Sequence, residues 1–390
     1  MATTEQIIER CQTLFEDLNF SSARQWKAQD PDRKVVGYMP IYIPRELIHA
    51  AGMLPLGILG GGDQIEVIQG DAYYQSYICR IPRSTIELFL TKRLDFVDGM
   101  LFPSICDVIR NLTGMLQLIR PDMYAHYYDM PQNYDDRIGG EFYINELQEL
   151  RHDFEKLSGN EITDRALTKS IRLYNRNREL TNKLYRLRAE QPWKVPAAEA
   201  YLVSRAGMLI PVKEHNTLLE EYVQAAASTD RVRRDNCRVV VSGMFCEQPP
   251  LNLIKSLELA GCYVVDDDFM LINRWMQEPV ADTGDPIESL SHAFLHHSAK
   301  TSATYEPIEA DKGQYLVEAV RRSGAEGVIF AAPSFCDPAL LERPMLQDAL
   351  NAANIPYIAF KYAENSGQMQ PIREQAGTFA DSIKLWGANA

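Results

Sequence analysis

Two cysteines of this sequence occupy matching positions in a short repeated motif. The pattern Pro-Ser-x-Cys-Asp occurs twice, once around Cys106 and once around Cys336. Each copy directly follows a short apolar run, which ends at Phe102 in the first copy and at Ala332 in the second. Ligands of open parallel sheets bind beyond the carboxyl ends of the strands, so both cysteines are candidates for a binding site. If the two copies face each other, the two thiolates converge on one point.

A third cysteine, Cys79, completes the candidate set. It is followed by Pro82 and by a helical stretch over residues 84–90, so it leads into the N-terminus of a predicted helix. The positive end of a helix dipole stabilises a thiolate, and the neighbouring Arg80 and Arg83 add to this effect.

Three thiolates suit a [4Fe–4S] cluster, one per chain, in which one iron lacks a protein ligand. Water, sulfide, a substrate atom or a ligand from another subunit could complete that iron. Zinc held by three cysteines is a competing interpretation, although zinc sites commonly use closely spaced cysteine pairs or add histidine. Buried, unreactive thiols are the third alternative. The other four cysteines are interpreted as structural: Cys11, Cys237, Cys246 and Cys262.

Three further groups of residues are weaker candidates for binding a phosphate, a cation or a catalytic metal. The glycine run 60–62 could cradle a phosphate, but neither a P-loop nor a dinucleotide fingerprint is present. The acidic run 266–268 could bind a cation and is expected instead to be solvated. The histidines at 292, 296 and 297 lack a metalloprotease pattern and are interpreted as surface residues.

Short apolar runs that alternate with helical periodicity predict an α/β fold with parallel sheets. The predicted strands form two sets of four, at residues 34–38, 55–59, 96–102 and 125–129 and at residues 238–243, 263–267, 327–332 and 356–361. With the repeated cysteine motif, this order predicts two pseudo-duplicated, Rossmann-like lobes. The predicted organisation is an N-terminal α/β lobe with an N-terminal helix (1–138), a helical segment (139–230) and a C-terminal α/β lobe (231–390).

The middle segment contains no strand-like run between residues 139 and 228. A long helix is predicted from Asp164 to Ala189, with Thr163 as its N-cap. One face of this helix is strongly basic and is expected to be a solvated surface rather than an anion-binding or docking face. It carries Lys169, Arg172, Arg176, Arg178, Lys183, Arg186 and Arg188.

Composition restricts the partners that this chain could have. Its 390 residues include 40 basic and 53 acidic side chains, a formal net charge of −13. That surplus argues against nucleic acid or an anionic membrane as the main partner. Neither a membrane-spanning apolar run nor an export signal is recognisable in the sequence. A cytoplasmic protein with reduced thiols is therefore expected.

Three groups of residues carry a family resemblance. They are an opening at Lys34–Pro40, Ile43–Ile48 and Ala50–Pro55, a central helix at Ile162–Leu167, Ser170–Ile171 and Tyr174–Asn175, and a C-terminal signature at Gly367–Gln368, Arg373 and Phe379. Over nearly its whole length the chain resembles the D-components of 2-hydroxyacyl-CoA dehydratases and the subunits of benzoyl-CoA reductases. The three candidate cysteines fall where this family places its cluster ligands.

The resemblance is strongest to the smaller of the two cluster-bearing subunits of ATP-dependent benzoyl-CoA reductases. It implies a heterotetramer containing a homologous cluster-bearing subunit and two subunits that hydrolyse ATP with Mg²⁺ and pass on electrons from ferredoxin. It further implies reduction of benzoyl-CoA to cyclohexa-1,5-diene-1-carbonyl-CoA in anaerobic aromatic degradation. A 2-hydroxyacyl-CoA dehydratase, which is a lyase, is the alternative enzyme, and an inert scaffold is a third interpretation.

Reduction of an aromatic ring needs electrons of very low potential, so water must be kept from the cluster. An aromatic wall is expected to do this, although ordinary core packing would account for each of its members, Tyr73, Tyr74, Tyr77, Phe102 and Phe335. Ser104 and Ser334 are candidates to donate hydrogen bonds to cluster sulfurs, and they could equally be ordinary turn residues.

Overall fold

The computed structural model describes residues 2–39, 41–243, 249–299, 312–363 and 369–386. It contains two four-stranded sheets, and every strand pair within them is parallel. The first sheet has the strands β1 (Val35–Tyr38), β2 (Leu54–Gly57), β3 (Gly99–Pro103) and β4 (Tyr124–Tyr128). The second has β5 (Cys237–Ser242), β6 (Cys262–Asp267), β7 (Gly327–Pro333) and β8 (Tyr357–Tyr362). The predicted α/β fold with two parallel four-stranded sheets is confirmed.

The two sheets repeat the same topology. Their strand orders are β2-β1-β3-β4 and β6-β5-β7-β8, so the first and third strands of each set lie side by side in the middle. In register, Val36 of β1 pairs with Gly99 of β3, and Val239 of β5 pairs with Gly327 of β7. The chain reverses its direction of winding between these central strands, and ligands of open sheets bind at such switch points.

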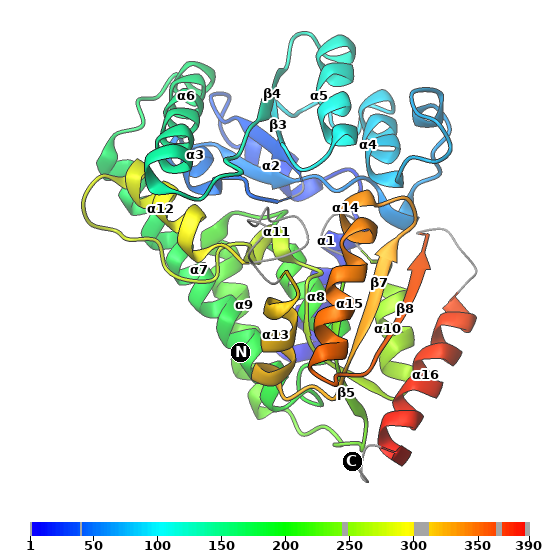
Figure 1. The fold of residues 1–390 in the computed structure, drawn as a ribbon. Coiled ribbons are helices and arrows are strands. Elements are labelled where there is room, and N and C mark those ends of the chain that lie inside the picture. Colours follow the sequence, from blue (N-terminus) through cyan, green and yellow to red (C-terminus); the bar gives the residue numbers. More distant parts are fainter. Residues whose placement is uncertain (1, 40, 244–248, 300–311, 364–368, 387–390) are drawn as a thin grey trace.

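Helices cover both sheets, and Figure 1 shows them in chain order. Those that precede the helical middle are α1 (Thr4–Glu16), α2 (Ser21–Ala28), α3 (Arg45–Ala50), α4 (Arg80–Leu90) and α5 (Asp107–Ile119). Those that accompany the second sheet are α10 (Leu251–Leu259), α11 (Leu271–Arg274), α12 (Pro286–His297), α13 (Gln314–Ser323), α14 (Asp337–Leu341), α15 (Arg343–Ala352) and α16 (Met369–Trp386). The arrows of β7 and β8 point toward the first lobe, so the carboxyl edge of the second sheet faces it (Figure 1).

The middle of the chain is helical, as predicted, with α6 (Glu141–Ser158), α7 (Asp164–Glu190), α8 (Ala197–Ala206) and α9 (Val212–Ser228). Thr163 is the N-cap of α7, because its side chain accepts a hydrogen bond from the backbone N–H of Ala166. Gly159 is the C-cap of α6, and its φ of 73° lies in the left-handed region that favours glycine. The boundaries between three domains, at residues 138 and 230, stay a prediction.

The basic face predicted for α7 is only partly solvated. Arg178 is 6% exposed and Arg188 is completely buried, so the expectation of a uniformly exposed face was wrong. Each of these guanidinium groups forms an ion pair with a buried carboxylate, that of Glu46 and that of Asp267 respectively. A buried charge is tolerated when it is paired in this way.

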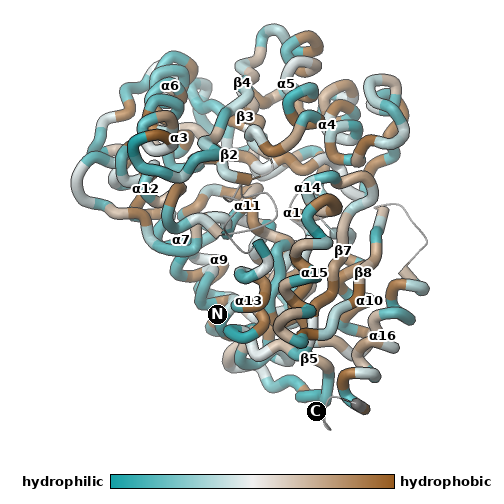
Figure 2. Tube along the Cα trace, in the orientation of Figure 1, coloured by the Kyte–Doolittle hydropathy of each residue, from teal (hydrophilic) through white to brown (hydrophobic). Residues whose placement is uncertain are grey.

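One hydrophobic core runs through both lobes and the helical middle. It includes Val36 and Leu101 of the first sheet, Leu180 of α7, and Val241 and Ile329 of the second sheet. A smaller cluster lies on the other face of the second sheet under α13 and α15. In Figure 2, brown hydrophobic residues gather on strands such as β7, whereas α6 carries long teal stretches. The lobes are thus packed against each other through shared apolar contacts.

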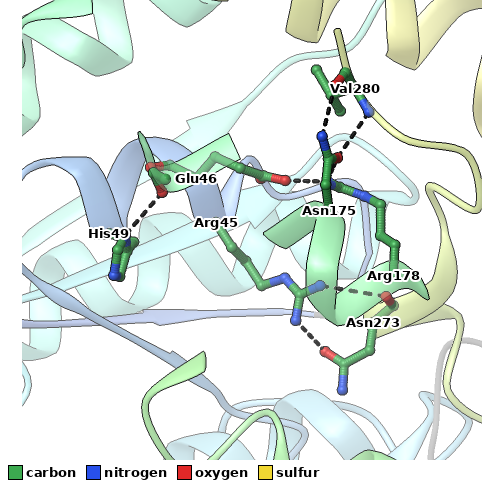
Figure 3. Close-up of polar contacts among 8 residues, drawn as sticks. Arg45, Glu46, His49, Asn175, Arg178, Asn273 and Val280 are labelled. Atoms are coloured by element: carbon green, nitrogen blue, oxygen red, sulfur yellow. Dashed lines mark hydrogen bonds and ion pairs between the residues drawn. The ribbon is translucent and has the colours of Figure 1, made fainter. Parts of the chain in front are cut away.

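Buried polar contacts also tie the lobes together (Figure 3). Arg45 of α3 donates a 2.5 Å hydrogen bond to the side-chain oxygen of Asn273 in α11, and both residues are buried. Its neighbour Glu46 forms the ion pair with Arg178 of α7. These contacts join an N-terminal helix to the helical middle and to the second lobe. They therefore fix how the carboxyl edges of the two sheets face each other.

Candidate functional site

All three candidate cysteines are N-cap residues of helices. Cys79 precedes α4, Cys106 precedes α5 and Cys336 precedes α14. Cys106 and Cys336 follow the equivalent strands β3 and β7, as the repeated motif predicts. The backbone N–H groups at the start of α4 and α5, together with the helix dipoles, favour negative charge at Cys79 and Cys106. The backbone thus favours a thiolate at Cys79 and Cys106.

The fold brings the three cysteines to one cavity of about 520 Å³ between the lobes. Cys79 and Cys106 are half-buried, and Cys336 is only 4% exposed. The remaining walls come from the loops after β1, β3 and β4, from α12, and from the segments before α13 and around α14. They include Tyr42, Ser104, Gln132, Tyr134, Phe294, Lys312, Phe335, Asp337 and Glu342. The cavity falls within the ~300–1,000 Å³ usual for small-molecule sites.

The thiols of Cys106 and Cys336 also influence each other's ionisation. Burial raises the pKa of Cys106, and the nearby Cys336 raises it further, while backbone N–H groups of Ile109 and Val108 partly oppose the shift. Burial likewise raises the pKa of the Tyr74 phenol, with smaller contributions from Cys79 and Cys106. A metal would favour the thiolate form of such cysteines.

Within the described ranges, no three His, Cys, Asp or Glu side chains are grouped closely enough to hold a single metal ion. The three cysteines are therefore spread around their shared cavity rather than gathered at one point. A single zinc ion needs all of its ligands at bonding distance, whereas an iron–sulfur cluster offers a separate iron to each thiolate. The donor set consists of sulfur only, which both zinc and iron–sulfur clusters accept, so the separation of the three thiols is what favours the cluster. Assignment of Cys79, Cys106 and Cys336 as ligands stays a prediction.

The polar neighbours of the cysteines are engaged elsewhere. Arg83 pairs with Asp71 at 3.0 Å, so its charge is partly neutralised. The Ser104 hydroxyl accepts a hydrogen bond from the backbone N–H of Met130. The Ser334 hydroxyl donates to the carbonyl of Tyr362, so its proton is unavailable to a cluster sulfur. The hydrogen bond of Ser334 is therefore explained by a role as an ordinary turn residue.

The aromatic wall differs from the predicted one. Phe102 is fully buried in the core, and Tyr73 and Tyr77 are 40% and 63% exposed. Of the predicted residues, Phe335 does line the cavity. It is joined there by three aromatic residues that sequence reasoning missed, Tyr42, Tyr134 and Phe294.

These three aromatic residues form one packed group. The ring of Phe294 stacks on Tyr134 with centroids 6.0 Å apart and meets Tyr42 edge-on at 5.6 Å. They come from three distant segments of the chain and share no motif. No sequence signal groups them.

The other predicted residues lie outside this cavity. Cys11, Cys237 and Cys262 are buried in the core, whereas Cys246 lies outside the described residues. Glycines 60–62 form the loop after β2. His292 and His296 are exposed on α12, as predicted, and His297 is half-buried.

The interpretation of the acidic run 266–268 as solvated was wrong for Asp267. Its carboxylate is completely buried and pairs with Arg188 in the interior.

Most of the chain matches a known protein family. Residues 40–383 match the family model described as 2-hydroxyglutaryl-CoA dehydratase, D-component. The chain belongs to this family. The match covers the second sheet, every strand of the first sheet except β1, and all three cysteines of the cavity, so the predicted family resemblance is confirmed. The predicted signature at Gly367–Gln368 lies outside the described residues, although within the matched range.

Curated members of the D-component family include reductase and dehydratase subunits. The chain is 65% identical to the C subunit of benzoyl-CoA reductase of Thauera aromatica, over 98% of this chain and 100% of that protein. It is 29% identical to the beta subunit of (R)-2-hydroxyglutaryl-CoA dehydratase of Acidaminococcus fermentans, over 92% and 94% of the two chains. It is 26% identical to the beta subunit of (R)-phenyllactyl-CoA dehydratase of Clostridium sporogenes, over 90% and 92%. Among the described residues of this family member, no helix is both long and apolar enough to cross a membrane.

Proposed function

We propose that this chain is the cluster-binding C (gamma) subunit of a benzoyl-CoA reductase and takes part in reducing the aromatic ring of benzoyl-CoA. The observation that carries the proposal is the cavity that Cys79, Cys106 and Cys336 line from both lobes. The identity of 65% to a benzoyl-CoA reductase subunit, against 29% and 26% to dehydratase subunits, supports the reductase over the lyase.

In this proposal the three N-cap cysteines hold a [4Fe–4S] cluster, one per chain. The cluster supplies single electrons of low potential when it is bound. The chain's own residues hold and shield the cluster. The N-terminal amides of α4 and α5 stabilise the thiolates. The aromatic rings of Tyr42, Tyr134 and Phe294 form an apolar wall that keeps water away, as reduced intermediates require.

The chain acts within a larger complex in this proposal. Its relatives are subunits of multi-subunit enzymes by their names. The partners are a homologous cluster-bearing subunit and two subunits that hydrolyse ATP with Mg²⁺ and accept electrons from reduced ferredoxin, in a cytoplasmic heterotetramer. The overall reaction adds two electrons and two protons to benzoyl-CoA and yields cyclohexa-1,5-diene-1-carbonyl-CoA.

The test is an anaerobic assay of the reconstituted four-subunit complex with ATP and reduced ferredoxin. Benzoyl-CoA is offered in one arm and a 2-hydroxyacyl-CoA in the other. We expect sustained oxidation of ferredoxin in step with loss of benzoyl-CoA. Dehydration of the 2-hydroxyacyl-CoA after only catalytic priming by ferredoxin would establish the lyase instead. Full activity of a complex in which this chain holds no iron would establish an inert scaffold.

A further inference from the structure

The cysteine cavity contains one ion pair, between Lys312 and Glu342, among the described residues that line it. Lys312 lies immediately before α13, and Glu342 lies between α14 and α15. The two side chains are 16% and 22% exposed. The Lys312 ammonium group contacts Oε1 of Glu342. The cavity therefore brings an ionisable carboxyl group close to the three thiols.

The second oxygen of this carboxyl group is unusual. Oε2 of Glu342 is buried and has no hydrogen-bond partner among the described residues. A buried carboxylate oxygen without a partner is energetically costly, so such atoms are rare without a functional reason. A proton on Oε2, or a ligand that hydrogen-bonds to it, would remove this cost. Because Glu342 lines the cavity, the proton or the ligand would lie at the candidate site.

Other ionisable groups share the cavity wall with Glu342 or lie near it. Burial raises the pKa of the Tyr315 phenol of α13, and the carboxylates of Asp268 and Glu342 raise this pKa further. Asp107 and Asp337 also line the cavity. Lys312 is thus the positive group at this wall, opposed by several acidic groups. Added negative charge raises the proton affinity of a nearby carboxylate.

We propose that Glu342 is the proton donor of the cavity, taking a proton from solvent onto Oε2 and passing it to the substrate ring. This inference rests on the proposed function. Each electron delivered by ferredoxin adds one negative charge, first to the cluster and then to the ring. The O–H bond at Oε2 breaks as a C–H bond forms at the ring, and Glu342 is left as a carboxylate paired with Lys312. Two such rounds supply the two protons that balance the two electrons.

The decisive variant is Glu342→Gln in the reconstituted complex, because glutamine keeps the shape but does not titrate. A general acid contributes about 10²–10⁴-fold to rate, so we expect benzoyl-CoA reduction to slow at least 100-fold. Iron content and the spectrum of the reduced cluster should be unchanged. Glu342→Asp retains a carboxyl group and should recover part of the rate. A rate within threefold of the unmodified complex for Glu342→Gln would overturn the proposal.

The matched control is Glu199→Gln. Glu199 pairs with Arg231 at 2.9 Å and is 21% exposed, so its burial is close to that of Glu342, but it does not line the cysteine cavity. We expect this variant to keep the normal rate. An equal loss in Glu199→Gln and Glu342→Gln would show a general effect of removing a carboxylate and would also refute the proposal.

A second readout separates failure of this inference from failure of the proposed function. Infrared difference spectra of the complex, recorded as the clusters are reduced without substrate, should show a protonated-carboxyl band that shifts in D₂O. This band should be absent in Glu342→Gln and present in Glu199→Gln. Its persistence in Glu342→Gln would exclude Glu342 as the proton acceptor, whichever substrate the complex uses. Absence of benzoyl-CoA reduction in the unmodified complex would instead overturn the proposed function.

Discussion

Arg188 of α7 and Asp267 at the end of β6 form an ion pair of 2.6 Å in which both side chains are completely buried. The ring of Tyr185 lies 4.3 Å from the Arg188 guanidinium group, and its hydroxyl donates a 3.2 Å hydrogen bond to Asp267. The pair joins the helical middle to the second sheet. Like the ion pair between Glu46 and Arg178 on the first lobe, it anchors one lobe to α7.

Neutralising one partner of this pair should strongly destabilise the fold. Asp267→Asn leaves the Arg188 charge buried without its counter-ion, and such a change costs about 3–5 kcal/mol of the free energy of unfolding. Urea denaturation monitored by circular dichroism measures this loss. Asp282→Asn is the control, because Asp282 and its partner Arg172 are 44% and 62% exposed. Exposed pairs contribute about 0–1 kcal/mol. Equal losses in both variants would contradict the buried-pair assignment.

His215 should make stability depend on pH. This residue of α9 is 2% exposed, and burial lowers its pKa to about 4. The carbonyl of Val203 can only accept a hydrogen bond, so Nε2 of His215 carries the proton, and Nδ1 accepts from Asn177. A second proton on Nδ1 would break the contact with Asn177. The neutral ring is therefore the form that the native structure stabilises.

Whether the free energy of unfolding rises or falls with pH depends on which state, folded or unfolded, binds the proton more readily. Between pH 6.5, the usual pKa of histidine, and pH 4, the unfolded chain binds a proton that the folded chain does not. Stability due to His215 is therefore complete above pH 6.5 and falls as the pH drops, by about 2 kcal/mol between pH 7 and pH 5. Urea denaturation at these two pH values tests this. His215→Gln should show a smaller difference than the unmodified protein, and an unchanged difference would exclude His215 as the source.

Each of the three cavity cysteines should be needed for iron. The variants Cys79→Ala, Cys106→Ala and Cys336→Ala each remove one thiolate, and a cluster that already has an iron without a protein ligand is not expected to survive the loss of another. The measurement is iron per chain after anaerobic purification, with about four expected for the unmodified protein. Cys262→Ala is the control, since Cys262 is fully buried at the start of β6 and away from the cavity. Full iron content in all three cavity variants would refute the ligand assignment.

Much of the fold could be predicted from the sequence because its signals are local. Eight strands appear in the sequence as short apolar runs, and the side-chain oxygen of Thr163 indicates where α7 begins. Cys106 and Cys336 were found by their repeated motif, and the position of the motif after a strand implied a place at the carboxyl edge of a sheet. Each of these inferences needs only neighbouring residues.

The tertiary structure decided the rest, because charge burial and cavity walls depend on residues that are far apart in the chain. Nothing local distinguishes Arg188, which is fully buried, from Arg172 on the same helix, which is exposed; only the approach of Asp267 does so. Likewise, Lys312 and Glu342 meet through the packing of α13 against α15. Local sequence signals were sufficient to recognise the family, to locate the strands and to nominate the three cysteines. Which charges are buried and which residues surround the thiols depend on contacts between distant parts of the chain, so these features are visible only in the folded structure.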